Sequence, residues 1–233
     1  DNTSVGRGSM SSSTTGSTNA ALGFNALASN TTASNNTAVG SAALGSNTTG
    51  TDNVAVGSEA LDANTTAAGG TAIGRLSLST NTTGAGNTAV GMSALRLNTT
   101  GTQNVAMGLS ALEANTTAAN NTALGYNSLA ANTTGTGCVA VGTLALDASN
   151  AESKIVAVGS SALTANTTGT NGVAVGADAL KTNTTGDFNT GIGFGALEAN
   201  TTADNNTAVG FASLGANTTG GANTAVGFGA LDA

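Results

Sequence analysis

The sequence contains no proline, no tryptophan and no histidine, and it has a single cysteine. Without histidine the chain cannot form a Ser-His-Asp or Cys-His arrangement, an imidazole general base or a zinc site of the common His-containing kinds. One cysteine excludes an intrachain disulfide. Charged residues are only 7% of the chain, whereas soluble domains average about a quarter. We therefore predict no catalytic residues, no metal site and no cofactor.

Basic residues are also scarce, because five Lys and Arg stand against twelve Asp and Glu, for a net charge of −7. This charge has the wrong sign for the electrostatic attraction that drives binding to nucleic acid, and it disfavours anionic membranes. Gly, Thr, Asn or Ser interrupts every apolar run well before the roughly 20 residues that a membrane-spanning helix needs. We predict neither nucleic-acid binding nor membrane insertion for this segment.

What the chain has instead is a repeat of 17 residues, marked by a glycine that closes the phrase Thr/Val-Ala-Val-Gly. The spacing holds without insertion or deletion, and strict phase of this kind argues against a disordered Gly/Ser/Thr/Asn-rich linker. We call these residues the repeat glycines: Gly6, Gly23, Gly40, Gly57, Gly74, Gly91, Gly108, Gly125, Gly142, Gly159, Gly176, Gly193, Gly210 and Gly227.

The repeat predicts an all-β fold. Seventeen residues are too few for two packed helices, and a β-branched phrase bounded by Gly and Asn is typical of a short strand. We predict a parallel β-solenoid, or β-roll, of about 14 coils, in which each 17-residue coil holds two short strands and stacks on its neighbours at about 4.8 Å. We expect residues 1–233 to form one such domain, uncapped at both ends, as a segment of a longer fibre.

Two apolar columns are the predicted core of the solenoid. The residue before each repeat glycine is always apolar, and the fourth residue after it is Met10 in the first coil and Leu in the other thirteen. The positions two before and three after the glycine hold almost only Ala or Ser, with Gly191 as the smaller exception. We expect these narrow columns to be where a second subunit approaches.

Asparagine fills two further columns, which we predict to be hydrogen-bonded ladders at turns. The strand-Asn column, four residues before the glycine, comprises Asn2, Asn19, Asn36, Asn53, Asn87, Asn104, Asn121, Asn189, Asn206 and Asn223. The turn-Asn column, followed by Thr-Thr in each case, comprises Asn30, Asn47, Asn64, Asn81, Asn98, Asn115, Asn132, Asn166, Asn183, Asn200 and Asn217. Each Asn-Thr-Thr is also an N-glycosylation acceptor sequence, so sparse glycosylation is the alternative interpretation.

The residue directly after the repeat glycine holds five of the six aromatic residues. We call this position the aromatic column, and we predict that it is a subunit interface or a partly buried corner. A receptor-binding or lateral packing patch is the alternative, since three of its members occupy successive coils. The aromatic members are Phe24, Tyr126, Phe194, Phe211 and Phe228.

One coil, between Gly142 and Gly159, departs from the pattern, and we call it the irregular coil. Ser149-Asn150-Ala151 replaces Asn-Thr-Thr, and Cys138 occupies the strand-Asn column just before this coil. We interpret the change as drift in a tolerant turn. A cross-link through Cys138 is the alternative.

The phrase Asn53-Val54-Ala55-Val56-Gly57, together with its equivalents at 104–108 and 223–227, resembles the Asn-Ser-Val-Ala-Ile-Gly phrase of YadA-like head repeats in trimeric autotransporter adhesins. It is also similar to repeats of phage tail-fibre shafts. The resemblance implies a left-handed parallel β-roll, three chains side by side, an extracellular location and adhesion. The present repeat lacks the serine after Asn and is lengthened by the Asn-Thr-Thr turn.

We therefore predict a structural and adhesive fibre module without catalysis, located outside the cell, on a cell surface or on a phage tail fibre. Its expected partners are copies of itself, as a homotrimer or an end-to-end polymer, and a host-surface or glycan receptor. One alternative is an extracellular filament subunit that stacks end to end. A second is an ice-binding solenoid, in which Asn and the second Thr of each Asn-Thr-Thr form two parallel ranks.

Overall fold

The computed structural model describes residues 1–232 of the chain, which contain fourteen three-residue strands and no helix. One strand falls in each 17-residue repeat. The strands are β1 (Thr3–Val5), β2 (Ala20–Leu22), β3 (Thr37–Val39), β4 (Val54–Val56), β5 (Thr71–Ile73), β6 (Thr88–Val90), β7 (Val105–Met107), β8 (Thr122–Leu124), β9 (Val139–Val141), β10 (Val156–Val158), β11 (Val173–Val175), β12 (Thr190–Ile192), β13 (Thr207–Val209) and β14 (Thr224–Val226). The predicted parallel β-solenoid is confirmed.

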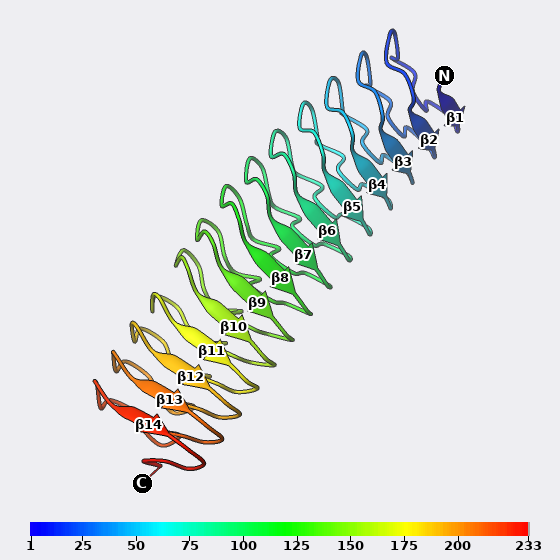
Figure 1. Ribbon diagram of the computed structural model, residues 1–233. Helices are drawn as coiled ribbons and strands as arrows, with labels where there is room; N and C mark the ends of the chain where they lie inside the picture. The colour runs from blue at the N-terminus through cyan, green and yellow to red at the C-terminus, as the bar shows by residue number, and fades with distance from the viewer. Residues whose placement is uncertain (233) are drawn as a thin grey trace. The chain divides into compact units, whose positions relative to one another are not determined.

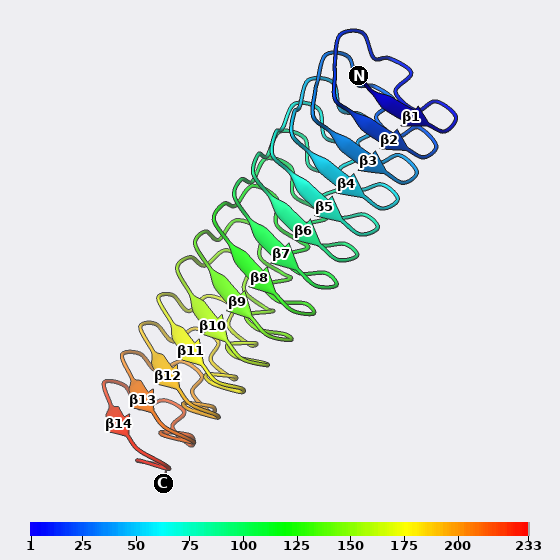
Figure 2. The same cartoon turned by 45° about the vertical axis from the view of Figure 1, so that its right-hand side comes forward.

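The chain divides into two units, Asp1–Ala119 with β1 to β7 and Asn120–Ala233 with β8 to β14. Within the first unit, each strand pairs in parallel with the next one along the chain, as the successive arrows β1 to β7 show (Figure 1; Figure 2). The second unit is built in the same way. Within each unit, paired strand residues are 17 positions apart, for example Ala55 and Ala72, so identical repeat positions lie beside one another.

Each coil has one strand, and the prediction of two strands per coil is wrong. After Gly40, the chain makes three overlapping turns, in which the amides of Ala43, Gly45 and Asn47 each donate to the carbonyl three residues earlier, at 3.4, 3.1 and 3.2 Å. Ala42 and Leu44 have φ angles of 56° and 51°, as the third residue of a type II turn requires. Backbone in this left-handed region cannot continue as a strand.

The core is also different from the prediction in one column. Side chains alternate between the two faces of a strand, and here only the middle residue points inward: Ala55 is fully buried, whereas Val54 and Val56 are half-buried. The residues before the repeat glycines therefore lie on the outside of the solenoid. The Leu column is confirmed as core, because its members from Leu27 to Leu214 are at most 3% exposed.

The Ala and Ser columns face the interior, so the prediction that a second subunit approaches there is wrong. Ala55 and Ala60 are both 0% exposed and share the interior of their coil with Leu61. Where serine replaces alanine, its hydroxyl bonds within the coil, as Ser77 Oγ does by donating to the Gly74 carbonyl at 2.8 Å. These positions are small because one leucine and two asparagines already fill the space inside each coil.

The repeat glycine is required by the close approach of neighbouring coils. Gly57 has a φ of 138°, and a Cβ added there would lie 2.6 Å from the carbonyl carbon and oxygen of Gly74 in the next coil. A real Cβ cannot come so close to backbone, and this backbone angle is itself unfavourable for any L side chain. Glycine is therefore needed at Gly57 for two independent reasons, whereas at Gly227 only the backbone angle requires it, since the nearest atom to an added Cβ is the Ala230 Cβ at 4.0 Å.

We expect Gly57→Ala to lower the stability of the first unit by more than about 3 kcal/mol, because it adds both a backbone clash and backbone strain. Gly69→Ala is the matched control, since Gly69 has a φ of 67° with nothing within 4 Å of an added Cβ; strain alone predicts a loss of about 1 kcal/mol there. Guanidinium denaturation followed by circular dichroism measures both. Equal losses would contradict a role for coil-to-coil contact.

Candidate functional site

The turn-Asn column is an interior ladder of hydrogen bonds. Asn64 Nδ2 donates to Asn47 Oδ1 at 2.9 Å and to the Ala67 carbonyl at 3.1 Å, while its own Oδ1 accepts from Asn81 Nδ2 at 3.2 Å. The same amide-to-amide bond links successive members from Asn30 to Asn115 in the first unit and from Asn166 to Asn217 in the second. The side chains from Asn30 to Asn200 are at most 1% exposed.

The strand-Asn column forms a second ladder, parallel to the first. Asn53 accepts from the Gly70 amide through Oδ1 at 2.8 Å, and its Nδ2 donates to the Ala67 carbonyl at 2.9 Å. That carbonyl also accepts from Asn64, so both ladders meet on one backbone oxygen per coil. Asn19 to Asn206 are at most 2% exposed, and the end members Asn2 and Asn223 are more accessible. The ladder interpretation of both columns therefore fits the structure.

Glycosylation of the turn-Asn column does not fit this geometry. The glycan would be attached to Nδ2, which is the atom that donates both ladder bonds in Asn64, and this side chain is completely buried. Modification would remove the amide from the interior of the coil.

The Asn-Thr-Thr turn places its three side chains in different environments. The first Thr donates from Oγ1 to the carbonyl of its equivalent in the next coil, as Thr48 does to Thr65 at 3.0 Å. The second Thr, such as Thr49 or Thr66, is exposed. Asn and the second Thr therefore lie on opposite sides of the backbone, and the prediction that they form paired ice-binding ranks is wrong.

The outer side of the strands is an apolar surface. We call the first and third residues of β1 to β14 the outer strand face. In the first unit it exposes Leu22 (51%), Ile73 (40%) and Met107 (45%). In the second unit it exposes Val175, Ile192 and Val226. Thr or Val stands at the first strand position of every strand except β2, which begins with Ala20, so the face carries methyl groups but no charge.

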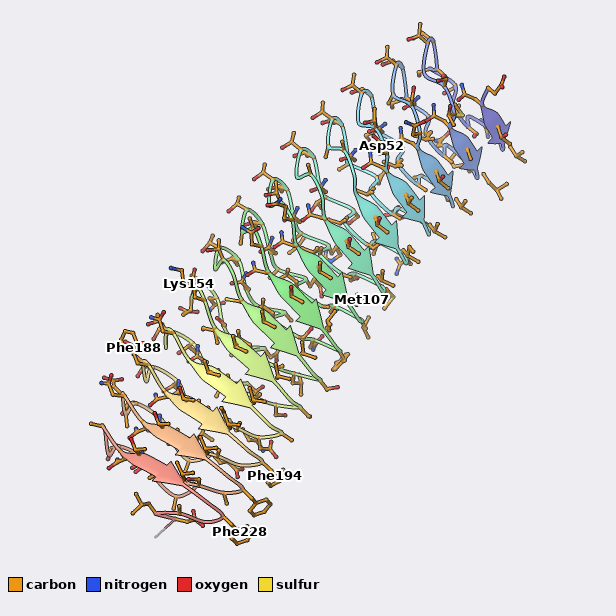
Figure 3. All side chains as sticks on the ribbon, in the orientation of Figure 1. Asp52, Met107, Lys154, Phe188, Phe194 and Phe228 are labelled. Atoms are coloured by element: carbon orange, nitrogen blue, oxygen red, sulfur yellow. The ribbon has the colours of Figure 1, made fainter. Side chains whose placement is uncertain are left out.

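The aromatic column borders this face and points outward. Phe194, Phe211 and Phe228 are 51%, 49% and 83% exposed, with ring centroids 5.3 and 5.1 Å apart and planes within 13°. Figure 3 shows Phe194 and Phe228 at the edge toward which the strands point, away from Lys154 and Phe188 at the opposite edge of this unit. The prediction that the aromatic column is a partly buried corner is therefore wrong. Because the ring faces cover one another, the surface offered to a partner is a ridge of ring edges.

The other aromatic residues do not extend this ridge. Phe24 is 50% exposed in the first unit, with the Arg7 guanidinium 5.9 Å from its ring centroid, and Tyr126 is 48% exposed in the second. Phe188, the one aromatic residue outside the aromatic column, lies in a turn five residues before Gly193, with a φ of 55° and 57% exposure. Asn, Asp or Gly fills most other coils at this position, which is the one signal that marks a turn there.

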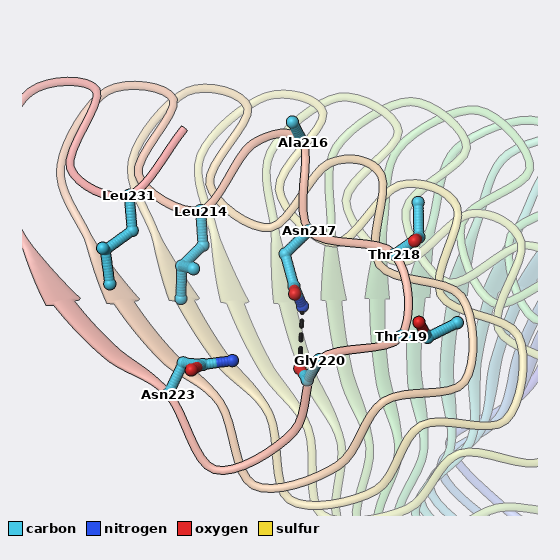
Figure 4. A pocket seen from close by; sticks show the side chains of 8 residues that line it. All are labelled: Leu214, Ala216, Asn217, Thr218, Thr219, Gly220, Asn223 and Leu231. Atoms are coloured by element: carbon cyan, nitrogen blue, oxygen red, sulfur yellow. Dashed lines mark hydrogen bonds between the residues drawn. The ribbon is translucent and has the colours of Figure 1, made fainter. Parts of the chain in front are cut away.

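A hollow of about 370 Å³ lies in the second unit. Figure 4 shows Leu214 and Leu231 pointing to the same side, and Asn217 Nδ2 donating to the Gly220 carbonyl at 2.9 Å. Asn223 completes the polar side of the lining. These four residues are members of the interior columns, with Asn217 bonded as its equivalents are and Asn223 bonded to Asn206 Oδ1, so the hollow has no polar groups of its own with which to select a ligand.

Charged groups are few, and seven of the seventeen charged residues directly follow a residue of the Leu column. Arg96 Nε donates to Glu113 Oε1 at 2.7 Å. Burial raises the pKa of Asp62, and the nearby charge of Glu59 raises it further. Burial also raises that of Glu113, but hydrogen bonds from Ser110 and Arg96 and the charge of Arg96 outweigh it, so that the Glu113 pKa is lowered.

Nothing outside the repeat points to a particular ligand. Residues 1–232 contain no group of three His, Cys, Asp or Glu side chains that could hold a metal ion, and no buried side-chain polar atom in this part of the chain is without a partner. The same residues contain no helix that could cross a membrane. Comparison of the chain with protein-family models, with characterised proteins and with solved structures gives no match.

We expect the natural chain to carry no N-glycan on the turn-Asn column, because the acceptor nitrogens are buried and bonded. Intact-mass measurement of the native material, with peptide mapping of the Asn-Thr-Thr segments, tests this against the 21.9 kDa of the unmodified chain. A glycan on Asn47 or Asn64 in folded protein would contradict the ladder.

Neutralising two carboxylates in the first unit, Asp62 and Glu113, should change the stability of the protein in opposite directions. The raised pKa of Asp62 means that its ionised form is disfavoured in the folded state, so Asp62→Asn should stabilise the protein at pH 7. At about pH 3 the carboxyl is largely protonated in both the folded and the unfolded state, and the substitution should have little effect on stability. The lowered pKa of Glu113 has the reverse consequence. Glu113→Gln should destabilise the protein at pH 7, and this loss should vanish as the pH falls through the pKa of folded Glu113.

Thermal denaturation of the two variants across this pH range measures both effects. Shifts of the same sign at pH 7 would show that local packing, and not ionisation, decides the stability at these positions.

Proposed function

We propose that the protein is a structural and adhesive fibre module without catalysis, whose copies associate through the outer strand face. One observation carries this proposal: the outer strand face is apolar and exposed, although the buried polar groups of the chain already have hydrogen-bond partners within it. Ile73 and Met107 are 40% and 45% exposed, while the Asn and Leu columns are buried. Large exposed apolar patches on soluble proteins mark sites of association.

The geometry of the face suits another copy of the same chain. Residues of one kind recur at the same position in every coil, so two faces present matching rows of Val, Ile, Leu, Met and Thr. A partner with the same 17-residue spacing keeps each row in contact along the whole unit. By resemblance to YadA-like head repeats, we propose three chains side by side in a left-handed β-roll, at a cell surface or in a phage tail fibre.

The aromatic column supplies the proposed adhesive contact. Phe194, Phe211 and Phe228 form an apolar ridge beside the outer strand face in the second unit. Exposed aromatic side chains are enriched at protein interfaces, where they carry much of the binding energy. A host-surface protein or glycan is the receptor class that we propose for a module of this kind.

Analytical ultracentrifugation of the purified chain tests the association. We expect a trimer of three times 21.9 kDa, and we expect Ile73→Lys combined with Met107→Lys to dissociate it by burying unpaired charge. Thr83→Lys combined with Thr117→Lys is the matched control, since both threonines are exposed and lie on the other side of the same two coils. A monomeric wild-type chain, or equal loss in the control, would overturn the proposal.

Electron microscopy of the same material separates the trimer from the filament alternative. Particles of one fixed length are expected from side-by-side association. Open-ended fibres that lengthen with protein concentration would favour a subunit that stacks end to end.

A further inference from the structure

Both asparagine ladders of the second unit are interrupted around the irregular coil. In the strand-Asn column, Cys138, Ile155 and Gly172 replace asparagine in three successive coils. In the turn-Asn column, Ser149 stands between Asn132 and Asn166. No other coil of this unit lacks asparagine in both columns, so the defects are concentrated in one place.

The replacement side chains make weaker bonds or bonds within their own coil. Cys138 Sγ donates to the Glu152 carbonyl at 3.3 Å, where Asn189 Nδ2 reaches the equivalent Ala203 carbonyl at 2.7 Å; a thiol is also a weaker donor than an amide. Ser149 Oγ donates to Glu152 Oε2 at 2.9 Å in its own coil. Ile155 has no polar side-chain atom with which to continue the ladder.

The same Glu152 carboxylate closes the turn of the irregular coil on itself. Oε2 accepts from the amides of Asn150 and Ala151, both at 3.1 Å. The Ser149 hydroxyl and the Glu152 carboxylate thus bond within the coil, while Thr133 Oγ1 of the preceding coil still donates to the Asn150 carbonyl at 2.8 Å. Backbone bonds persist, since the Val139 amide still donates to the Ile155 carbonyl at 2.9 Å and the Val156 amide to the Gly172 carbonyl at 3.0 Å.

Loss of ladder bonds should lower the cost of opening at this point. In repeat proteins each unit is held mainly by its nearest neighbours, so missing coil-to-coil bonds weaken one junction without being compensated elsewhere. Local opening occurs first where buried contacts and protected hydrogen bonds are fewest. The intact backbone bonds on both sides explain why the coil can nevertheless fold in register.

We infer that the irregular coil opens locally, ahead of the rest of the second unit, and that this opening exposes the Cys138 thiol. The second unit would then have one coil that opens more readily than its neighbours. This property goes beyond the proposed fibre function and does not depend on it. The thiol reports the opening because it is completely buried in the closed structure, where its Sγ lies 3.3 Å from the Glu152 carbonyl of the irregular coil. Burial also raises the pKa of the Cys138 thiol, which further suppresses its reaction while the coil is closed. The same burial leaves no access for the cross-link considered from the sequence.

Reaction of the full chain with Ellman's reagent under native conditions tests the inference. We expect Ser149→Asn to slow the labelling of Cys138 at least tenfold, because an asparagine there can donate to Asn132 and accept from Asn166. Ile155→Asn should also slow it, by restoring a donor to the Gly169 carbonyl and an acceptor for the Gly172 amide. Ser160→Asn is the matched control: it adds the same amide at an exposed position just after the irregular coil, and the rate should not change.

Labelling only at the rate of global unfolding, with no effect of either ladder variant, would overturn the inference. Hydrogen exchange of the wild-type chain gives a second reading that needs no variant to fold. Amides of residues 149–156 should exchange at least tenfold faster than those of 183–190, which occupy the same repeat positions in a regular coil. Equal protection of the two segments would also overturn it.

Discussion

The buried asparagine amides are the interaction on which the rest of this structure depends. A 17-residue coil has room inside for one leucine, two small side chains and two asparagines, which is too little apolar volume for an ordinary hydrophobic core. Each amide therefore bonds to its own coil and to a neighbouring one, as Asn64 does. Since these bonds require equivalent residues to lie in register, they couple the strict repeat of the sequence to the stacking of the coils.

The same constraint explains the unusual backbone of the turns. Leu44 and its equivalents hold φ angles near 51°, a region that costs a non-glycine residue about 1 kcal/mol or more. In return the leucine side chain is directed into the coil, and its amide donates to the Ala60 carbonyl of the next coil at 3.0 Å. Strain at one residue is offset by burial and by a bond between coils, repeated along each unit.

Because asparagine side chains occupy much of the interior of each coil, the apolar residues at the outer strand positions lie outside. The Val, Ile, Leu and Met residues that precede the repeat glycines would be core in a protein with a wider interior. Here they form the outer strand face, and the stacked rings of Phe194, Phe211 and Phe228 adjoin it in the second unit. The proposed association of chains follows from this division, and so does the weakness of the irregular coil, which keeps its leucine but lacks both amides.

The 17-residue period, together with the residue types that recur in it, predicted the all-β solenoid, the Leu core and the positions of the ladders, since residues 17 apart must face the same environment in every coil. It did not determine which residues face inward. The positions of Val56 and Leu61 are apolar in every coil. The strand at 54–56 directs Val56 outward, and the positive φ angles of Glu59 and Leu61 in the turns that follow direct Leu61 inward. Exposure of Phe194 and burial of Asn64 likewise depend on the direction of the backbone at each position. That direction is set by contacts between coils, which only the tertiary structure contains.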